Sequence, residues 1–190
     1  MEMKRCAWAE GGDELYTRYH DEEWGVPVHD DQKLFEFIVL ESAQAGLSWR
    51  IILNKREGYR KAFKNFDPKK VARMTEADIE RLCNDASIIR NRLKIKATIT
   101  NAQAFLAIQK EFGSFGVYMW NWVGNTPIQT KLKPTDNIPA STELATLMAK
   151  DLKKRGFKFL GPTVWYAHMQ AVGMTNDHTT NCFRFREITR

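Results

Sequence analysis

Hydrophobic residues recur at spacings of three and four along most of the chain, which is the pattern of amphipathic helices. The clearest example is the segment 34–49, LFEFIVLESAQAGLSW, in which one helical face carries Leu34, Phe37, Ile38, Glu41 and Ala45. Every member of that face is apolar except Glu41. A buried carboxylate must find a partner, become protonated or meet a ligand, because an unpaired buried charge is very costly. Two interpretations stay open: a structural glutamate held by a backbone amide or an arginine, or a carboxylate that belongs to a site.

Capping and stop signals predict further helices along the chain. They cover about 13–24, 48–63, 68–74, 75–85, 90–112, 115–123, 141–155 and 164–172. In the helix that Ser48 starts, we expect Arg56 to face outward, and Thr163 is the expected N-cap of the last helix. The segment 124–139 is predicted to be a surface loop. Strand-like alternation is confined to scraps such as FKFL at 157–160, so the predicted fold class is all-α.

The composition is that of a globular protein with a real core. The chain has 190 residues, of which 43% are hydrophobic and 27% charged, and we treat 1–190 as a single domain. The net charge of +6 favours an anionic polymer as partner, although such an excess is also common in proteins that bind nothing acidic. The chain shows neither a membrane-spanning run nor a signal-peptide pattern, so we expect a cytoplasmic protein with no membrane partner. Three cysteines, an odd number, argue against a disulfide framework.

Cysteine and histidine residues near both ends of the chain form a candidate metal site. His178 and Cys182 are four residues apart, so they lie on one helical face or on one turn of irregular chain. Cys6 and His20 would supply the second pair. Such a Cys2His2 set leaves no open coordination position, so the metal would be structural and would tie the two ends together. The alternative is two small hydrophobic side chains and two surface histidines, because short pairs occur by chance.

Positive charge is concentrated in the segment 86–96, ASIIRNRLKIK, which joins two predicted helices. Its cations are Arg90, Arg92, Lys94 and Lys96. A short turn between antiparallel helices can point backbone N–H groups at a phosphate, and the dipole of the following helix favours an anion there. This arrangement suits sequence-independent binding of a nucleic-acid backbone. The alternative is a solvated basic helix face.

Aromatic residues are the third candidate feature, because several can gather around Glu41. They are Trp8, Tyr16, Tyr19 and Trp49. A flat, electron-deficient ligand between such rings, with a carboxylate at its edge, would be held by stacking and by charge. Core packing is the alternative for any one of these rings. The chain has no glycine-rich phosphate loop, G-x-S-x-G turn or H-E-x-x-H motif.

Five sequence blocks carry a resemblance to a known family. They are Arg5–Trp8, Tyr19–Asp21 with Glu23–Pro27, Leu40–Glu41 with Gln44–Trp49, Lys153–Gly161, and Asn176–His178. In order and length these blocks resemble DNA-3-methyladenine glycosylase I, and the likeness runs from about residue 5 to Cys182. The resemblance implies a helix–hairpin–helix DNA glycosylase fold, with a base pocket between two helical lobes. It also implies a hairpin element at about 78–100 and a zinc site that ties the termini.

The resemblance also implies roles for individual residues. One structural Zn²⁺ per chain would be held by Cys6, His20, His178 and Cys182. Glu41 would be the catalytic residue and, with Tyr19, would hydrogen-bond the excised base, while Trp49 stacks on it. The pocket walls would be completed by Trp8 and Tyr16. The residues expected to contact DNA are Gln44, Gly46 and Leu47 at the gap in the duplex and Ser87, Arg90 and Arg92 at the hairpin.

One position departs from the family pattern, because Ser87 stands where we expect a glycine in the hairpin. Leu93 likewise occupies a position where a small residue would fit more easily. Glycine permits positive φ and close backbone approach. The hairpin turn is therefore expected to differ in detail.

The implied activity is hydrolysis of the N-glycosidic bond of 3-methyladenine in alkylated double-stranded DNA. The enzyme would flip the base into its pocket, act as a monomer, and be monofunctional, with no lyase step. The alternative from another class is a non-catalytic, zinc-stabilised DNA-binding module that uses the same hairpin and charge. A zinc hydrolase is a weaker alternative, because four protein ligands exclude an open metal position.

Overall fold

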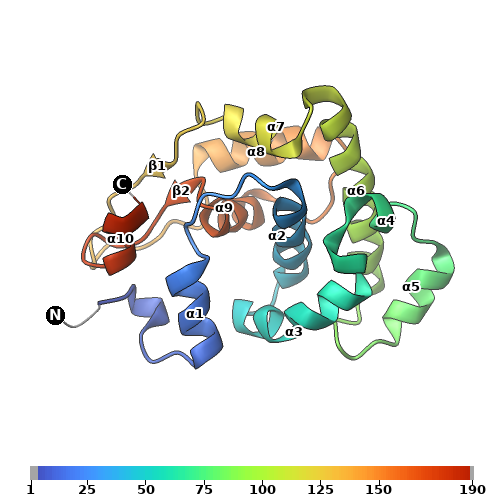
Figure 1. Cartoon of the computed structure of the whole chain (residues 1–190), viewed down its shortest axis with the longest axis horizontal. Helices are drawn as coiled ribbons and strands as arrows, with labels where there is room; N and C mark the ends of the chain where they lie inside the picture. Colours follow the sequence, from blue (N-terminus) through green and yellow to red (C-terminus); the bar gives the residue numbers. More distant parts are fainter. Residues whose placement is uncertain (1–3, 189–190) are drawn as a thin grey trace.

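The computed structural model describes residues 4–188. Within that range it has ten α-helices, two 3-10 helices and two very short strands (Figure 1). The helices are η1 (Ala7–Ala9), α1 (Glu14–Glu22), α2 (Asp31–Gln44), α3 (Trp49–Ala62), η2 (Lys64–Phe66), α4 (Pro68–Val71), α5 (Glu76–Cys83), α6 (Arg92–Phe112), α7 (Phe115–Asn121), α8 (Glu143–Lys154), α9 (Pro162–Ala171) and α10 (Phe183–Ile188). The strands are β1 (Ile128–Gln129) and β2 (Thr175–Asn176). The predicted all-α class is confirmed.

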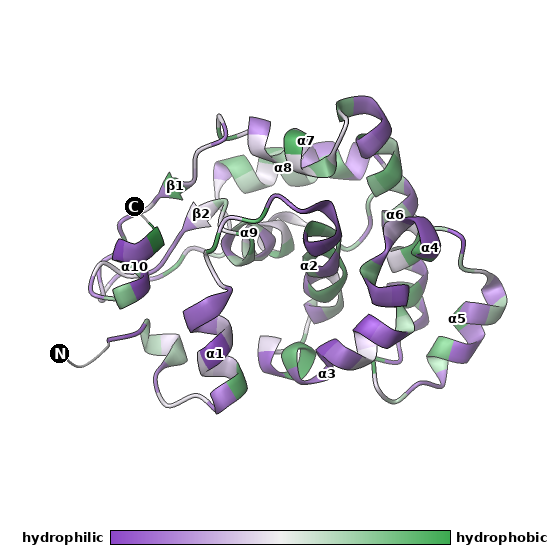
Figure 2. Cartoon of the chain, viewed as in Figure 1, coloured by the Kyte–Doolittle hydropathy of each residue, from purple (hydrophilic) through white to green (hydrophobic). Residues whose placement is uncertain are grey.

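Helix α2 lies at the centre of the molecule. It contacts α3, α6, α7 and α9, and all residues from 34 to 43 are buried. The amphipathic stripe predicted for this segment therefore understates its burial, because neighbouring helices cover every face. In Figure 2, α2 is purple at its first turn and mostly green beyond it. Asp30 caps the helix by accepting the N–H of Lys33 at 2.8 Å. Gly46 turns the chain just after the helix with φ +78°.

Two groups of elements flank α2 and form the two lobes. In Figure 1, α1, α10 and both strands lie on one side of it, and α4, α5 and α6 lie on the other. The two ends of the chain meet in the first lobe, where the N–H of Phe183 donates to the backbone oxygen of Lys4 at 3.0 Å. Among the described residues, no helix combines the length and apolar character that crossing a bilayer requires.

Two local predictions were wrong. The strands β1 and β2 pair in parallel, and β1 falls in the segment predicted to be a loop. A two-residue strand is too short to leave a pattern in the sequence. The strand-like alternation at 157–160 forms no strand, which agrees with the predicted all-α class. Helix α9 begins at Pro162 with Gly161 as its N-cap, ahead of Thr163, because proline is favoured in the first helical turn.

Arg56 was expected to face solvent but lies in a partly buried ion-pair network. Its guanidinium donates to Glu36 at 2.8 Å and to both carboxylate oxygens of Glu23 at 2.7 Å. Glu36 is almost fully buried, and a buried carboxylate requires such a partner. Burial acts to raise the pKa of Glu23, but the contact with Arg56 outweighs it and lowers that pKa to about 2. The network fixes α3 against α2, on the side next to the candidate site.

Candidate functional site

A cavity of about 190 Å³ lies beside α2, between the first lobe and the helices α2, α3 and α9. Residues from α1, α2, α3 and α9 line it together with residues from the segments between helices. They are Trp8, Tyr16, Tyr19, Trp24, Glu41, Gln44, Trp49, Ile138, Ala167 and Gln170. The structure thus brings the predicted carboxylate and all four predicted aromatic residues into one cavity. They come from segments up to 41 residues apart, counting from Trp8 to Trp49.

Glu41 is buried in this cavity without an ion pair. Its residue is 3% exposed, and its Oε2 has no hydrogen-bond partner among the described residues. Burial raises the pKa of its carboxyl from 4.5 to about 8. The indole Nε1 of Trp49 is also buried and has no hydrogen-bond partner in the described part of the chain. Two unsatisfied polar atoms that line one cavity are an arrangement that a bound ligand would complete. The interpretation of Glu41 as a structural glutamate paired with arginine or a backbone amide is not supported.

The aromatic rings form the walls around this carboxyl. The Tyr19 and Trp49 ring centroids are 5.3 Å apart at an interplanar angle of 47°. Trp8 and Tyr16 meet edge to face, with centroids also 5.3 Å apart. Burial, followed by the nearby charge of Glu41, raises the pKa of Tyr19, so its hydroxyl keeps its proton. The cavity therefore offers a protonated phenol and a carboxyl to a flat ligand.

Sequence reasoning missed four of the lining residues, of which Gln170 has the clearest structural role. Its Nε2 donates to the Asp177 carboxylate at 2.7 Å, and that carboxylate also accepts from Tyr166 and Thr175. Because an ionised carboxylate only accepts hydrogen bonds, the amide nitrogen of Gln170 must face Asp177. The amide oxygen then remains available to a ligand. Ala167 and Gln170 are three residues apart on α9, and this helical spacing was the signal in the sequence.

A second cavity of about 250 Å³ adjoins the first and shares Glu41, Gln44 and Ala167 with it. We call this second cavity the entrance cavity. The segment 44–47 lines one side of it, and Thr163 and Val164 line another. Three residues predicted to approach DNA, Gln44, Gly46 and Leu47, therefore lie at the mouth of the site. Leu47 is 36% exposed there.

The predicted phosphate-binding hairpin is the segment 84–91 between α5 and α6. Both the N–H and the hydroxyl of Ser87 donate to the Asp85 carboxylate, at 2.8 and 2.6 Å. The hairpin packs closely on α3, where a Cβ at Gly58 would lie 2.2 Å from the Ser87 backbone oxygen. Ser87 is absent from the residues with positive φ, so this turn needs no glycine at that position.

The cations of the hairpin region have different environments. Arg90 is exposed and forms no ion pair with the described residues, whereas Arg92 pairs with Glu76 and Glu80 of α5. The ammonium of Lys94 donates to backbone oxygens at the end of α2. The expectation that Lys94 belongs to a cluster of phosphate-binding charges is therefore wrong, because the C-terminus of α2 occupies its ammonium. Of these three cations, Arg90 is the one whose side chain has no ion pair or hydrogen bond within residues 4–188.

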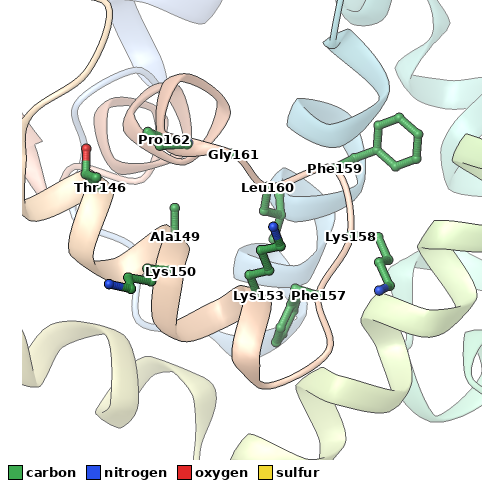
Figure 3. Close-up of a pocket in the computed structure, with 10 residues that line it drawn as sticks. All are labelled: Thr146, Ala149, Lys150, Lys153, Phe157, Lys158, Phe159, Leu160, Gly161 and Pro162. Carbon is green, nitrogen blue, oxygen red and sulfur yellow. The ribbon is translucent and has the colours of Figure 1, made fainter.

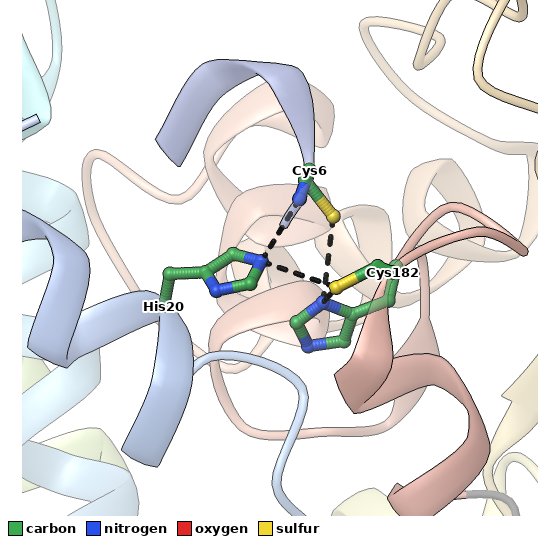
Figure 4. Close-up of side chains that lie close together, drawn as sticks. Cys6, His20 and Cys182 are labelled. Atoms are coloured by element: carbon green, nitrogen blue, oxygen red, sulfur yellow. Dashed lines mark hydrogen bonds between the residues drawn. The ribbon is translucent and has the colours of Figure 1, made fainter. Parts of the chain in front are cut away.

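The four predicted metal ligands are buried together where the chain ends meet. The ligand atoms of Cys6, His20, His178 and Cys182 all lie within 4.8 Å of one another. Both cysteine sulfurs are 3.5 Å from Nδ1 of His178, and the Cys182 sulfur is 3.6 Å from Nε2 of His20 (Figure 4). A tetrahedral site with metal–sulfur bonds of about 2.3 Å and metal–nitrogen bonds of about 2.0 Å has sulfur–nitrogen edges of about 3.5 Å. The spacing of the donors therefore fits a tetrahedral metal ion.

Neighbouring groups prepare these side chains for metal binding. Nδ1 of His20 lies 2.8 Å from Asp21, and Nε2 of His178 lies 2.9 Å from the backbone oxygen of Trp24. Such contacts fix which ring nitrogen is free for the metal. A hydrogen bond from Cys6 and contacts with both histidines lower the pKa of the Cys182 thiol, which favours the thiolate that a metal binds.

Comparison with known proteins places the chain in a family. The methyladenine glycosylase family model matches residues 8–185. The chain belongs to the methyladenine glycosylase family. It is 51% identical over 180 residues to DNA-3-methyladenine glycosylase 1 of Escherichia coli (strain K12), covering 95% of this chain and 96% of that one. It is 46% identical over 178 residues to DNA-3-methyladenine glycosylase of Haemophilus influenzae (strain ATCC 51907 / DSM 11121 / KW20 / Rd), covering 94% and 96%.

Solved structures of methyladenine glycosylases have the same fold. A crystal structure of 3-methyladenine DNA glycosylase I is 51% identical to this chain, with a TM-score of 0.91, and covers 95% of this chain and 98% of that one. The Staphylococcus aureus enzyme, solved to explain its recognition of 3-methyladenine, is 40% identical, with a TM-score of 0.90 and coverage of 95% and 96%. The predicted helix–hairpin–helix glycosylase fold is therefore confirmed.

Proposed function

We propose that this protein is a monofunctional DNA glycosylase that hydrolyses the N-glycosidic bond of 3-methyladenine in double-stranded DNA. The observation that carries the proposal is the buried Glu41 carboxyl, whose Oε2 has no partner among the described residues, in an aromatic cavity beside α2. The family supports it, because the relatives named above are 3-methyladenine DNA glycosylases. The proposed reaction belongs to base-excision repair of alkylated DNA.

The first step is selection of the damaged base. A base methylated at N3 carries a positive charge, and a nearby cation favours the ionised form of Glu41. In the empty cavity the raised pKa keeps that carboxyl largely protonated at neutral pH. Entry of the cation would release the proton and place opposite charges side by side. Normal adenine carries no such charge, so it gains less from the same cavity.

The second step is holding the flipped nucleotide. Trp49 offers a face for stacking, and the Tyr19 hydroxyl and the Gln170 amide oxygen offer a donor and an acceptor at the edge of the purine. Damaged bases unstack more cheaply than normal ones, which favours their extrusion. Leu47 at the cavity entrance would occupy the gap that the nucleotide leaves in the duplex.

The third step is cleavage of the bond between N9 and C1′. The bonding electron pair stays with N9, so the cationic base departs as a neutral molecule and requires little help from a general acid. The oxygen of a water molecule adds to C1′, and that water loses a proton. No lysine lines either cavity within the described residues, and the Lys94 ammonium is bonded to two carbonyls. This supports hydrolysis by water in preference to a Schiff base with an amine.

We further propose that Cys6, His20, His178 and Cys182 hold one structural Zn²⁺. Four protein ligands leave no position for a water or substrate, so the ion would fasten the termini and take no part in bond cleavage. A single chain contains the complete cavity and the complete cluster, so we expect a monomer. We also expect it to work in the cytoplasm, on the DNA there.

The proposal is tested by incubating the purified protein with methylated duplex DNA and separating the released bases. Release of free 3-methyladenine, leaving abasic sites and an unbroken strand, is the expected result. Binding of the DNA without release of any base would instead identify the non-catalytic, zinc-stabilised module. Strand cleavage coupled to release would contradict the monofunctional assignment.

A further inference from the structure

The block Lys153–Gly161 marks the family in the sequence, yet the base cavity, its entrance and the metal cluster do not use it. Together with α8 and the start of α9 it encloses a separate groove of about 400 Å³. In Figure 3, Lys150 and Lys153 project from α8. Lys158 projects from the segment that connects α8 to α9, so that Lys153 appears between Lys150 and Lys158 in this view. We call this the lysine groove. None of the steps of the proposed excision reaction uses the residues of this groove.

The lysine groove carries positive charge without a counter-charge. Lys150, Lys153 and Lys158 are all exposed, and none forms an ion pair with the described residues. Within residues 4–188, no carboxylate lines the groove. Arg155, on the same stretch of chain, is by contrast paired with both Glu111 and Asp151. A concave surface lined by one sign of charge attracts anions from solution.

The segment that carries Lys158 is held rigidly. The Asn101 side chain on α6 accepts the N–H of Lys158 at 2.7 Å and donates to its backbone oxygen at 3.0 Å. The next residue, Phe159, has φ +57°, a conformation that is unfavourable for a bulky side chain. Phe159 is 39% exposed. Sites that bind nucleic acids combine cations with exposed aromatic rings on which bases stack. Phe159 has this environment, and a strained backbone such as its own is typical of functional sites.

The position of the groove relative to the base cavity indicates its ligand. Gly161 and Pro162 line the groove and begin α9, and the next two residues line the entrance cavity opposite the segment 44–47. The groove and the mouth of the site therefore meet at the first turn of α9. The first-turn N–H groups of Thr163 and Val164 have no partner within α9, as at any helix start, and add to the attraction for an anion.

We propose that the lysine groove binds the phosphate backbone of the DNA that flanks the flipped nucleotide. Phe159 lies against the sugar or base next to the damaged one, and Lys153 and Lys158 neutralise neighbouring phosphates. This proposal rests on the proposed function, since it takes the DNA to be positioned with its damaged base in the cavity. The groove would add a second contact with the DNA phosphate backbone, besides the one expected of the hairpin 84–91, on another side of the entrance cavity.

The test compares two variants that lose the same charge. One is the double variant Lys153→Gln/Lys158→Gln. The matched control is Lys61→Gln/Lys69→Gln, which removes two exposed lysines of α3 and α4 that form no ion pair with the described part of the chain. The probe is a duplex that contains a stable abasic-site analogue, titrated at several salt concentrations. We expect the groove variant to bind about tenfold more weakly, with a log–log salt slope reduced by about 2, as the loss of two phosphate contacts requires.

Further measurements separate this proposal from the proposed function. Lys153→Arg/Lys158→Arg keeps the charge and is expected to bind like the wild type, and binding of free 3-methyladenine is expected to be unchanged in every variant. Equal losses of DNA affinity in the groove variant and the control would overturn the proposal, because net charge alone would then explain both. A wild type that excises 3-methyladenine while its groove variant keeps full affinity and slope would also overturn it, and would leave the proposed function intact.

Discussion

The ammonium of Lys94, on α6, donates a hydrogen bond of 2.6 Å to the backbone oxygen of Ala45. A second bond of 2.8 Å reaches the backbone oxygen of Ala43. One lysine therefore satisfies two of the carbonyls at the C-terminus of α2, where a positive charge is also favoured by the helix dipole. This contact joins the helix that follows the hairpin to the segment 45–47 at the cavity entrance.

Replacing Lys94 with methionine is expected to lower the free energy of unfolding by about 1–3 kcal/mol, because two carbonyls lose their partner. It is also expected to weaken binding of an abasic duplex, since Gly46 and Leu47 lose their support. Denaturant unfolding and a DNA titration measure the two effects. Lys110→Met is the matched control, because Lys110 is exposed on the same helix, lies outside the basic segment 86–96 and forms no ion pair with the described residues. Equal effects in both variants would contradict the account.

The raised pKa of Glu41 predicts a pH-dependent gain in stability for Glu41→Gln. The carboxyl has a pKa of about 8 in the folded protein and about 4.5 when exposed, so between these values the folded state holds a proton that the unfolded state has lost. Wild-type stability therefore falls as the pH rises through this window, by about 1.4 kcal/mol per pH unit. The glutamine variant lacks this fall. Unfolding curves from pH 4 to 9 test it, and a constant difference between the two proteins would refute the burial of an unpaired carboxyl.

His168 provides an independent test of the core, outside the site. It is fully buried, both of its ring nitrogens lack a hydrogen-bond partner among the described residues, and its ring stacks on Trp165 at 4.5 Å. Replacement by phenylalanine keeps the stack and removes two unsatisfied polar atoms, so we expect a gain of about 1–3 kcal/mol at neutral pH.

The same residue makes the gain depend on pH. Burial lowers the pKa of His168 from 6.5 to about 3, so between these values the unfolded state binds a proton that the folded state does not. The stability of the wild type is therefore lost as the pH falls below about 6.5, and the His168→Phe variant escapes that loss. Thermal unfolding at several pH values measures the difference, which should widen towards acid. A variant less stable than wild type throughout would show that His168 has a partner.

Removal of a metal ligand should affect stability more than the chemistry of the cavity. Cys182→Ser is expected to lose stoichiometric zinc and several kcal/mol of stability, about the scale at which structural zinc contributes to folding. Cys83→Ser is the control, because Cys83 lies outside the cluster. Metal analysis and thermal unfolding give the result. Wild-type protein purified without zinc, and unaffected by a chelator, would refute the proposed ion.

The sequence was sufficient where the signal was local. Helical spacing and caps located α2 and placed Glu41 on a buried face, and the family blocks indicated the aromatic residues that now line one cavity with it. The ligand quartet was also correctly brought together, although His178 and Cys182 lie on irregular chain. In each case the residue type itself carried the information, as an apolar position, a ring or a metal donor.

The interactions that sequence reasoning missed depend on tertiary neighbours. Nothing in the pattern of α3 shows that Arg56 meets two carboxylates, or that Lys94 reaches across to the end of α2. A lysine or arginine on a helix has the same sequence pattern whether it faces solvent or a distant carbonyl. Gln170 was overlooked for the same reason, because its role depends on Asp177, which approaches it only in the folded chain.

The central claim is that the unpaired carboxyl of Glu41 selects and holds the alkylated base. Its most direct test is single-turnover release of 3-methyladenine from methylated duplex DNA by the wild type and by Glu41→Gln, with the affinity of both for an abasic duplex measured alongside. We expect the variant to release the base more slowly, on the order of a hundredfold, while its DNA affinity is unchanged. Release at the wild-type rate by Glu41→Gln would contradict the account.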